Sequence, residues 1–368
     1  MPDVQFGFCL PIFASPGINL FRAPGYAELD ALVTMELGRL ADALGYDSLW
    51  VADHLMLGKD DAILEGWTVL AALAGATSRA KLGMIHQANY FRHPALAAKM
   101  SATLDQISGG RLIHFLDCGY MRREYVNYDL PWNDDLDRRI ADLIEATELI
   151  LALWTTDGPV THTGQTYHVD NAILNPKPVQ QPHPPLWFGE ATPGILDACA
   201  RYGQGWNTTP VSIPELRTRL AALDAACERA GRSRSELELS LETQILIAPD
   251  LDSLRERLRW MVELATGGQP LPDDIQPFLD RYAEHAGLLR FVRGETDELP
   301  AKLAVDWLIG TPDQIARRLR DYIAEGISHF LLWFMDAPNT DGMRLFASEV
   351  APRFRQRQPA WADAHTMS

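Results

Sequence analysis

Residues 26–54, YAELDALVTMELGRLADALGYDSLWVADH, contain a helical pattern followed directly by a strand pattern. Apolar residues recur at helical spacing over residues 26–44, and Gly45 is a common type of helix terminator. Residues 48–51 then form a short apolar run that is typical of a buried strand. Because residues 4–11 also have a strand pattern, the first part of the chain predicts a strand–helix–strand unit.

The same alternation continues to the end of the chain. Further strands are predicted at residues 81–85, 111–116, 186–188, 205–208, 238–247 and 330–334. Further helices are predicted at residues 67–77, 94–106, 137–154, 194–202, 214–230, 312–325 and 342–354, with a small hairpin at 159–169. Eight strands and eight helices in this order predict an α/β fold of the (β/α)8, or TIM-barrel, class.

The domain organisation follows from this count. A chain of 368 residues could hold two domains, but α/β barrels commonly exceed 250 residues as one domain. We therefore predict a single barrel domain over residues 1–355. An insertion at about residues 251–300 separates strands seven and eight, and residues 356–368 form a C-terminal tail.

The composition bears on partners and location. The chain has 33 Lys and Arg against 49 Asp and Glu, a formal charge of −16, which repels nucleic acid and anionic membranes. It has neither a signal-peptide pattern nor a run of 18 apolar residues, so we expect a cytoplasmic protein. The cysteines match neither a disulfide framework nor a zinc site, and we expect free thiols at Cys9, Cys118, Cys199 and Cys227.

In a (β/α)8 barrel the active site lies at the carboxyl ends of the strands. Asp53 and His54 follow the second strand, where His54 could act as an acid, a base or a hydrogen-bond donor near neutral pH. The alternative is a loop histidine bound to a backbone group. The residues that we expect at the ends of strands three and four are Ile85, Asn89, Asp117 and Gly119.

The fifth strand runs into Gly189, Glu190, Ala191 and Thr192. Thr192 is a plausible helix N-cap, and Pro193 would occupy the first helical position. Free backbone N–H groups at such a helix start form a possible phosphate cradle, whereas an ordinary capped helix is the alternative.

Several enzyme classes lose support because their motifs are absent. The chain has no G-x-G-x-x-G after the first strand, no G-x-x-x-x-G-K-[ST], no G-x-S-x-G and no H-E-x-x-H. A metal-dependent barrel hydrolase stays open as an alternative, with possible ligands Asp53, His54, His86 and Asp117. Its weakness is that no strand carries a histidine pair, so we expect no metal. His162 and His168 flank the predicted hairpin turn and are interpreted as a surface pair.

Several spaced motifs now match a known pattern. They are GYDSLWVADH at 45–54, RHPA at 92–95, LDQISGGR at 104–111, NPKPVQ at 175–180, PPLWFG at 184–189, ACARYGQGWN at 198–207 and GTPD at 310–313. Together they resemble the bacterial luciferase-like family of flavin-dependent oxidoreductases, over about residues 4–355.

This resemblance implies a monooxygenase that uses oxygen and reduced FMN, supplied by a separate flavin reductase, to oxidise a small organic substrate. The alternative within the family is an oxidoreductase that uses a reduced 5-deazaflavin coenzyme. A third possibility is a catalytically silent homologue. His54 would face the cofactor ring, and we expect a homo-oligomer. The implied cofactor-binding residues are Asp53, Ile85, Asn89, Asp117, Gly119, Gly189, Glu190, Ala191 and Thr192.

Two departures from the family pattern concern the cofactor. The family commonly has G-x-G-x-G-W after strand four, whereas this chain has FLDCGY at residues 115–120. Glu190 stands where a glycine or small residue is usual, and an acid beside a phosphate is unfavourable unless its side chain points away. The insertion lies where the family has its mobile lid, which would exclude water.

Overall fold

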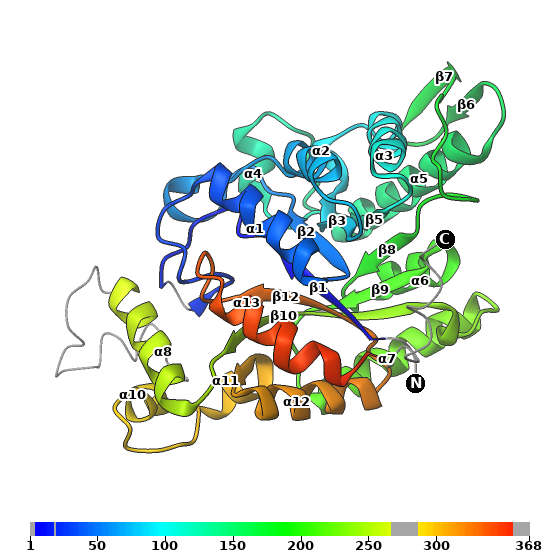
Figure 1. Ribbon diagram of the computed structural model, residues 1–368. Helices are drawn as coiled ribbons and strands as arrows, with labels where there is room; N and C mark the ends of the chain where they lie inside the picture. The colour runs from blue at the N-terminus through cyan, green and yellow to red at the C-terminus, as the bar shows by residue number, and fades with distance from the viewer. Residues whose placement is uncertain (1–3, 18–19, 266–285, 356–368) are drawn as a thin grey trace, which may run out of the picture.

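The computed structural model describes residues 4–17, 20–265 and 286–355. Eight parallel strands form its barrel: β1 Gln5–Cys9, β2 Ser48–Ala52, β3 Lys81–Ile85, β5 Leu112–Asp117, β8 Leu186–Gly189, β9 Gly205–Thr208, β10 Glu238–Ile247 and β12 His329–Phe334. They pair in chain order, and the pairing of β10 with β12 and of β12 with β1 closes the ring (Figure 1). The predicted (β/α)8 barrel is therefore confirmed.

The principal helices around the barrel are α1 Ala31–Leu44, α2 Gly66–Ala76, α3 Pro94–Ser108, α5 Leu136–Thr155, α6 Pro193–Tyr202, α7 Ile213–Arg229 and α12 Pro312–Ala324. Local sequence sets the bounds of α1. The Asp30 side chain accepts hydrogen bonds from the first-turn N–H groups of Leu32 and Val33, and Gly45 ends the helix at φ 88°. Because Asp30 is the cap, the predicted start of this helix at Tyr26 is wrong by five residues.

Several short elements were not predicted from the sequence. These are β4 Gln87–Ala88, β11 Leu308–Gly310, α4 Arg122–Asn127, and the 3-10 turns Lys59–Asp61, Asn89–Phe91 and Arg234–Glu236. The hairpin strands are β6 Val160–Thr163 and β7 His168–Ala172. The predicted last helix is divided into α13 Asp341–Leu345, a π-helical turn Phe346–Val350 and a 3-10 turn Ala351–Arg353, because Pro352 cannot continue a regular α-helix.

The insertion between strands seven and eight is present, with α8 Leu251–Ala265, α10 Ala286–Val292 and α11 Ala301–Asp306. Its helices pack around a second apolar cluster, which includes Leu254, Leu258, Met261, Leu288 and Phe291 and joins them to Leu246 of β10. Residues 266–285 of the insertion and the predicted tail at 356–368 lie outside the described residues. The domain boundaries therefore stay a prediction.

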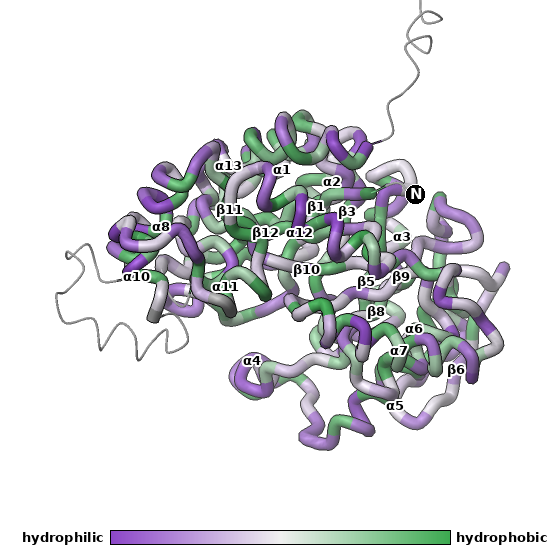
Figure 2. The backbone as a smooth tube through the Cα atoms, turned by 90° about the horizontal axis from the view of Figure 1, so that it is seen from below, coloured by the Kyte–Doolittle hydropathy of each residue, from purple (hydrophilic) through white to green (hydrophobic). Residues whose placement is uncertain are grey.

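The register of the strands brings their carboxyl ends to one mouth. Ala52 pairs with Ile85, and Gly189 pairs with Asn207. Hydrophobic residues concentrate along the barrel strands (Figure 2), and all four cysteines are free and buried. In the described ranges, no helix combines the length and apolar character that crossing a bilayer requires.

Candidate active site

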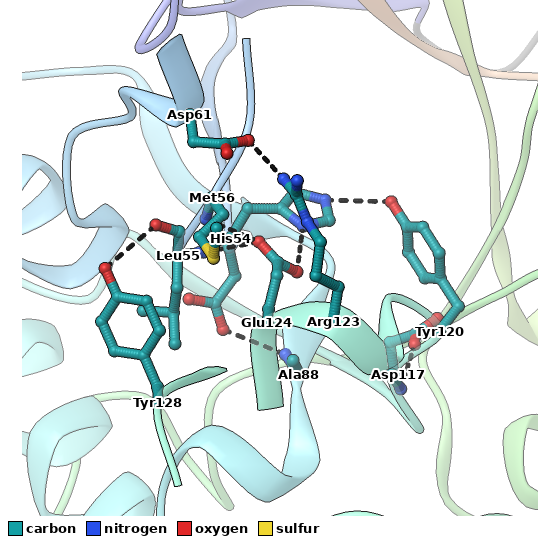
Figure 3. A network of polar contacts seen from close by, with 12 residues as sticks. His54, Leu55, Met56, Asp61, Ala88, Asp117, Tyr120, Arg123, Glu124 and Tyr128 are labelled. Atoms are coloured by element: carbon teal, nitrogen blue, oxygen red, sulfur yellow. Dashed lines mark hydrogen bonds and ion pairs between the residues drawn. The ribbon is translucent and has the colours of Figure 1, made fainter. Parts of the chain in front are cut away.

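His54 lies at the barrel mouth with protein partners on both ring nitrogens. Its Nδ1 lies 2.9 Å from Glu124 Oε2, and its Nε2 lies 2.9 Å from the Tyr120 hydroxyl (Figure 3). The His54 side chain is only 10% exposed, whereas Tyr120 is 61% exposed. The inner partner is therefore fixed by burial, and the outer partner faces solvent.

Glu124 holds the loop after β2 as well as the histidine. The residue is 1% exposed, and its Oε1 accepts hydrogen bonds from the backbone N–H groups of Leu55 at 2.7 Å and Met56 at 2.8 Å. One carboxylate thus joins α4 to the end of β2 through three contacts (Figure 3). This arrangement fixes the orientation of the His54 ring.

Asp53 has a structural partner. Its carboxylate accepts two hydrogen bonds from Arg92, at 2.8 and 3.0 Å, and one from the Ala88 N–H at 3.0 Å. Burial raises the pKa of Asp53 more than the Arg92 guanidinium lowers it. The carboxylate therefore ties the end of β2 to the segment before α3, and its predicted contact with a cofactor stays a prediction.

The structure brings some of the other predicted residues together. One pocket is lined by His54, His86, Asp117, Gly119, Tyr120 and Glu124, with Asp53 beside them. Asp117 Oδ1 accepts from the Gly119 N–H at 2.6 Å, and Gly119 adopts φ 77°, which favours glycine. Asn89 instead donates to the Tyr167 hydroxyl at 2.9 Å, and Ile85 is 4% exposed and does not line this pocket.

Glu190 occupies a conformation that explains why glycine suits its position. Its φ is 72°, in the left-handed region, while its N–H donates to the Asn207 carbonyl at 3.0 Å. Its carboxylate lies 3.8 Å from an Arg219 nitrogen on α7. The acid that departs from the family pattern thus has a cation beside it.

We expect Glu190→Gly to stabilise the fold by about 0.5–1 kcal/mol. Glycine removes the strain of a side chain at positive φ, and the lost ion pair is long and partly exposed, so it contributes little. Chemical denaturation of the two proteins measures the difference. A destabilised glycine variant would show instead that the contact with Arg219 dominates.

Helix α6 begins at the predicted residues. Thr192 is the N-cap residue and Pro193 is the first helical residue, but the Thr192 side chain makes no capping hydrogen bond. The expected side-chain cap is therefore wrong. Its hydroxyl is not used by the first turn of the helix.

The described residues provide no set of metal ligands for the hydrolase alternative. Within residues 4–17, 20–265 and 286–355, no three His, Cys, Asp or Glu side chains gather closely enough to hold a metal ion. Asp53 is bound to Arg92, and His54 is bound to Glu124. His162 of the hairpin lies 3.3 Å from Glu145.

Residues 5–329 match the model of the family described as luciferase-like monooxygenase. The chain belongs to this family. A curated relative from Microbacterium testaceum (strain StLB037), named F420-dependent glucose-6-phosphate dehydrogenase, is 28% identical over 88% of this chain and 93% of its own length. A Mycobacterium bovis protein (strain BCG / Pasteur 1173P2) named phthiodiolone/phenolphthiodiolone dimycocerosates ketoreductase is 26% identical over 79% of this chain and 84% of its own.

Solved structures of the luciferase-like fold superpose over nearly the whole chain. An F420-dependent secondary alcohol dehydrogenase has a TM-score of 0.71 at 22% identity, covering 96% of this chain and 100% of that chain. The EDTA monooxygenase of Chelativorans sp. BNC1 has a TM-score of 0.74 at 18% identity, covering 96% and 93%. At these identities the structures establish the fold alone. As a luciferase-like family member, the protein is an oxidoreductase.

Proposed function

We propose that this protein transfers a hydride between the deazaflavin coenzyme F420 and a small organic substrate. The observation that carries the proposal is the similarity to five proteins named F420-dependent glucose-6-phosphate dehydrogenase, at 26–28% identity over 86–88% of this chain. This favours the deazaflavin alternative over the expected FMN monooxygenase. The solved structures do not separate the two, because a monooxygenase from Streptomyces bottropensis and the F420-dependent secondary alcohol dehydrogenase are both 22% identical to this chain.

The residues at the start of α6 suit the phosphate of such a cofactor. The Thr192 hydroxyl has no role as a cap, and the positive end of the helix dipole favours an anion there. Arg219 balances the carboxylate of Glu190 nearby. Gly189, Glu190, Ala191 and Thr192 would therefore hold the phosphate, and the ring would lie toward His54, Asp117 and Gly119.

When bound, F420 supplies the carbon centre that accepts or donates the hydride. The chain supplies the proton transfer. In the tautomer in which His54 Nδ1–H donates a hydrogen bond to Glu124, the lone pair of Nε2 faces the Tyr120 hydroxyl. We infer that a substrate oxygen displaces this exposed hydroxyl, and that Nε2 takes the proton of an alcohol or returns it to a carbonyl.

A turnover screen tests this function. Purified protein with F420 and a panel of small alcohols should reduce the coenzyme for at least one alcohol, followed by its absorbance. Reduced FMN with oxygen should give no oxygenated product from the same panel. Oxygenation with FMN and no F420 reduction would support the monooxygenase instead.

The remaining partners follow from the choice of cofactor. A small-molecule substrate is part of the proposal, whereas a flavin reductase partner belongs to the FMN alternative. The homo-oligomer and the cytoplasmic location stay predictions.

Thr192→Ala separates the two roles of this residue. Because its side chain makes no capping hydrogen bond, we expect the free energy of unfolding to change by less than about 0.5 kcal/mol. The affinity for F420 should fall roughly tenfold if the hydroxyl donates to the phosphate. Thermal unfolding and a fluorescence titration measure the two effects. A lower melting temperature with unchanged affinity would assign Thr192 to the fold alone.

A further inference from the structure

A second polar cluster lies at the carboxyl end of the barrel and adjoins the His54 pair, because His86 lines the same pocket as His54. Glu242, within β10, is fully buried, and its Oε1 accepts from Arg22 and from Trp333 Nε1 at 2.7 Å. Its Oε2 has no hydrogen-bond partner among the described residues. This Oε2 atom lies 3.5 Å from His86 Nε2, a distance that exceeds a normal hydrogen bond. His86 Nε2 likewise has no hydrogen-bond partner among the described residues.

Asn207 on β9 adds a third such atom. The residue is fully buried, and its Oδ1 accepts from Ser240 Oγ at 2.7 Å, but its Nδ2 has no partner among the described residues. Asn207 pairs in register with both Gly189 and Ser240, the latter two residues before Glu242 on β10. A Cβ at Gly189 would lie 3.6 Å from the His86 ring. We call Glu242, His86 and Asn207 the barrel floor.

The charges of the barrel floor determine what it can bind. The Arg22 guanidinium lies 4.8 Å from the ring centres of both Phe21 and Trp333 and pairs with Glu242. Burial raises the pKa of Glu242, but Arg22 and His86 outweigh it and bring the pKa to about 2. The positive charge of Arg22 is thus used within the protein, and Glu242 presents an ionised acceptor oxygen.

His86 contributes the opposite polarity. Burial lowers its pKa, but the Glu242 carboxylate raises it more, with smaller contributions from Asp117 and Glu190. The imidazole therefore faces the carboxylate as a donor. Donors at His86 and Asn207 with an acceptor at Glu242 match a hydroxyl group, which both donates and accepts. A phosphate or carboxylate would be repelled by Glu242.

We propose that the barrel floor is the subsite that binds a second hydroxyl group of a neutral polyol substrate, other than the hydroxyl that reacts at His54. The hydroxyl donates to Glu242 Oε2 and accepts from His86 or Asn207, so that buried polar atoms that lack a hydrogen bond gain one. This inference rests on the proposed function, because it names the substrate class of that reaction. It also makes Glu242 and His86 residues that determine specificity.

Histidine ring signals in nitrogen NMR spectra of the full chain provide the test. The probes are glycerol and ethylene glycol as neutral alcohols with more than one hydroxyl, and acetate and inorganic phosphate as anions. His86→Gln assigns the His86 signal. We expect the alcohols to shift it in the parent protein and the anions to leave it unchanged. No shift with either alcohol, or a shift at lower concentration with an anion, would overturn the subsite.

Glu242→Gln keeps an acceptor for Arg22 and Trp333 but removes the charge. We expect it to weaken the alcohol-induced shift about tenfold. Asp336→Asn is the matched control, since Asp336 is also buried and also pairs with an arginine, Arg257, at 2.7 Å. It should leave the shift unchanged. Equal weakening by both variants, or by neither, would overturn the assignment.

Asn207→Ser provides a second variant should Glu242→Gln fail to fold, and it should also weaken the shift. A titration with F420 on the same samples separates the two proposals. Alcohol binding without F420 binding would overturn the proposed function but not the subsite. F420 binding without alcohol binding would overturn the subsite alone.

Discussion

His54→Ala should lower turnover by about 10²-fold or more, while the barrel stays folded and F420 affinity changes only several-fold. The physical reason is the position of the ring. Glu124 fixes Nδ1, and among the described residues the partner of Nε2 is the hydroxyl of Tyr120, a largely exposed side chain that a substrate can displace. Turnover with saturating cofactor, beside the melting temperature of each protein, measures the effect.

His162→Ala is the matched control for this prediction. His162 also lies close to a glutamate, Glu145, but on the hairpin and not in the pocket that His54 lines. Its replacement should leave turnover unchanged. If His54→Ala stays within about threefold of the parent at an unchanged melting temperature, His54 is a structural loop residue.

Glu124→Ala should destabilise the fold by about 3 kcal/mol or more and also lower turnover. The substitution removes the acceptor of two partly buried backbone N–H groups and of the His54 ring, and each donor left unpaired away from water costs about 1–3 kcal/mol. Chemical denaturation measures the loss.

Glu124→Gln separates the loss of stability from the loss of turnover. Its amide oxygen still accepts from the N–H groups of Leu55 and Met56, so most of the stability should return. Its amide nitrogen faces Nδ1 as a donor, which reverses the tautomer of His54, so turnover should stay low. An alanine variant within about 1 kcal/mol of the parent would contradict the account of Glu124.

The barrel could be predicted because its evidence is local. Each strand is a short apolar run, and each helix has its own periodicity and cap, so the alternation is visible without tertiary contacts. The placement of Asp53, His54, Asp117 and Gly119 around one mouth then follows from the topology. The start of α1 was predicted too early because the apolar pattern begins before the residue that caps the helix.

The partners within the site could not be predicted in the same way. Glu124 and His54 are 70 residues apart, and α4 has only six residues, too few for a helical period to appear. Glu242 did leave a signal, as an acid within a ten-residue strand whose other residues are mostly apolar. That signal could not show which groups would surround the carboxylate.

The sequence motifs could not distinguish FMN from F420, for a chemical reason. FMN and F420 share a phosphate and a tricyclic ring, so motifs that fit those parts fit both. Glu190 made the phosphate site doubtful because sequence could not show that Arg219, from another helix, lies beside it.

Parallel binding titrations of the purified protein with F420 and with FMN test the central claim most directly. Each is followed by the change in cofactor fluorescence, with Thr192→Ala as the site variant. We expect F420 to bind in a one-to-one complex at least tenfold more tightly than FMN. FMN binding as tight as or tighter than F420, weakened by Thr192→Ala, would contradict the assignment to deazaflavin chemistry.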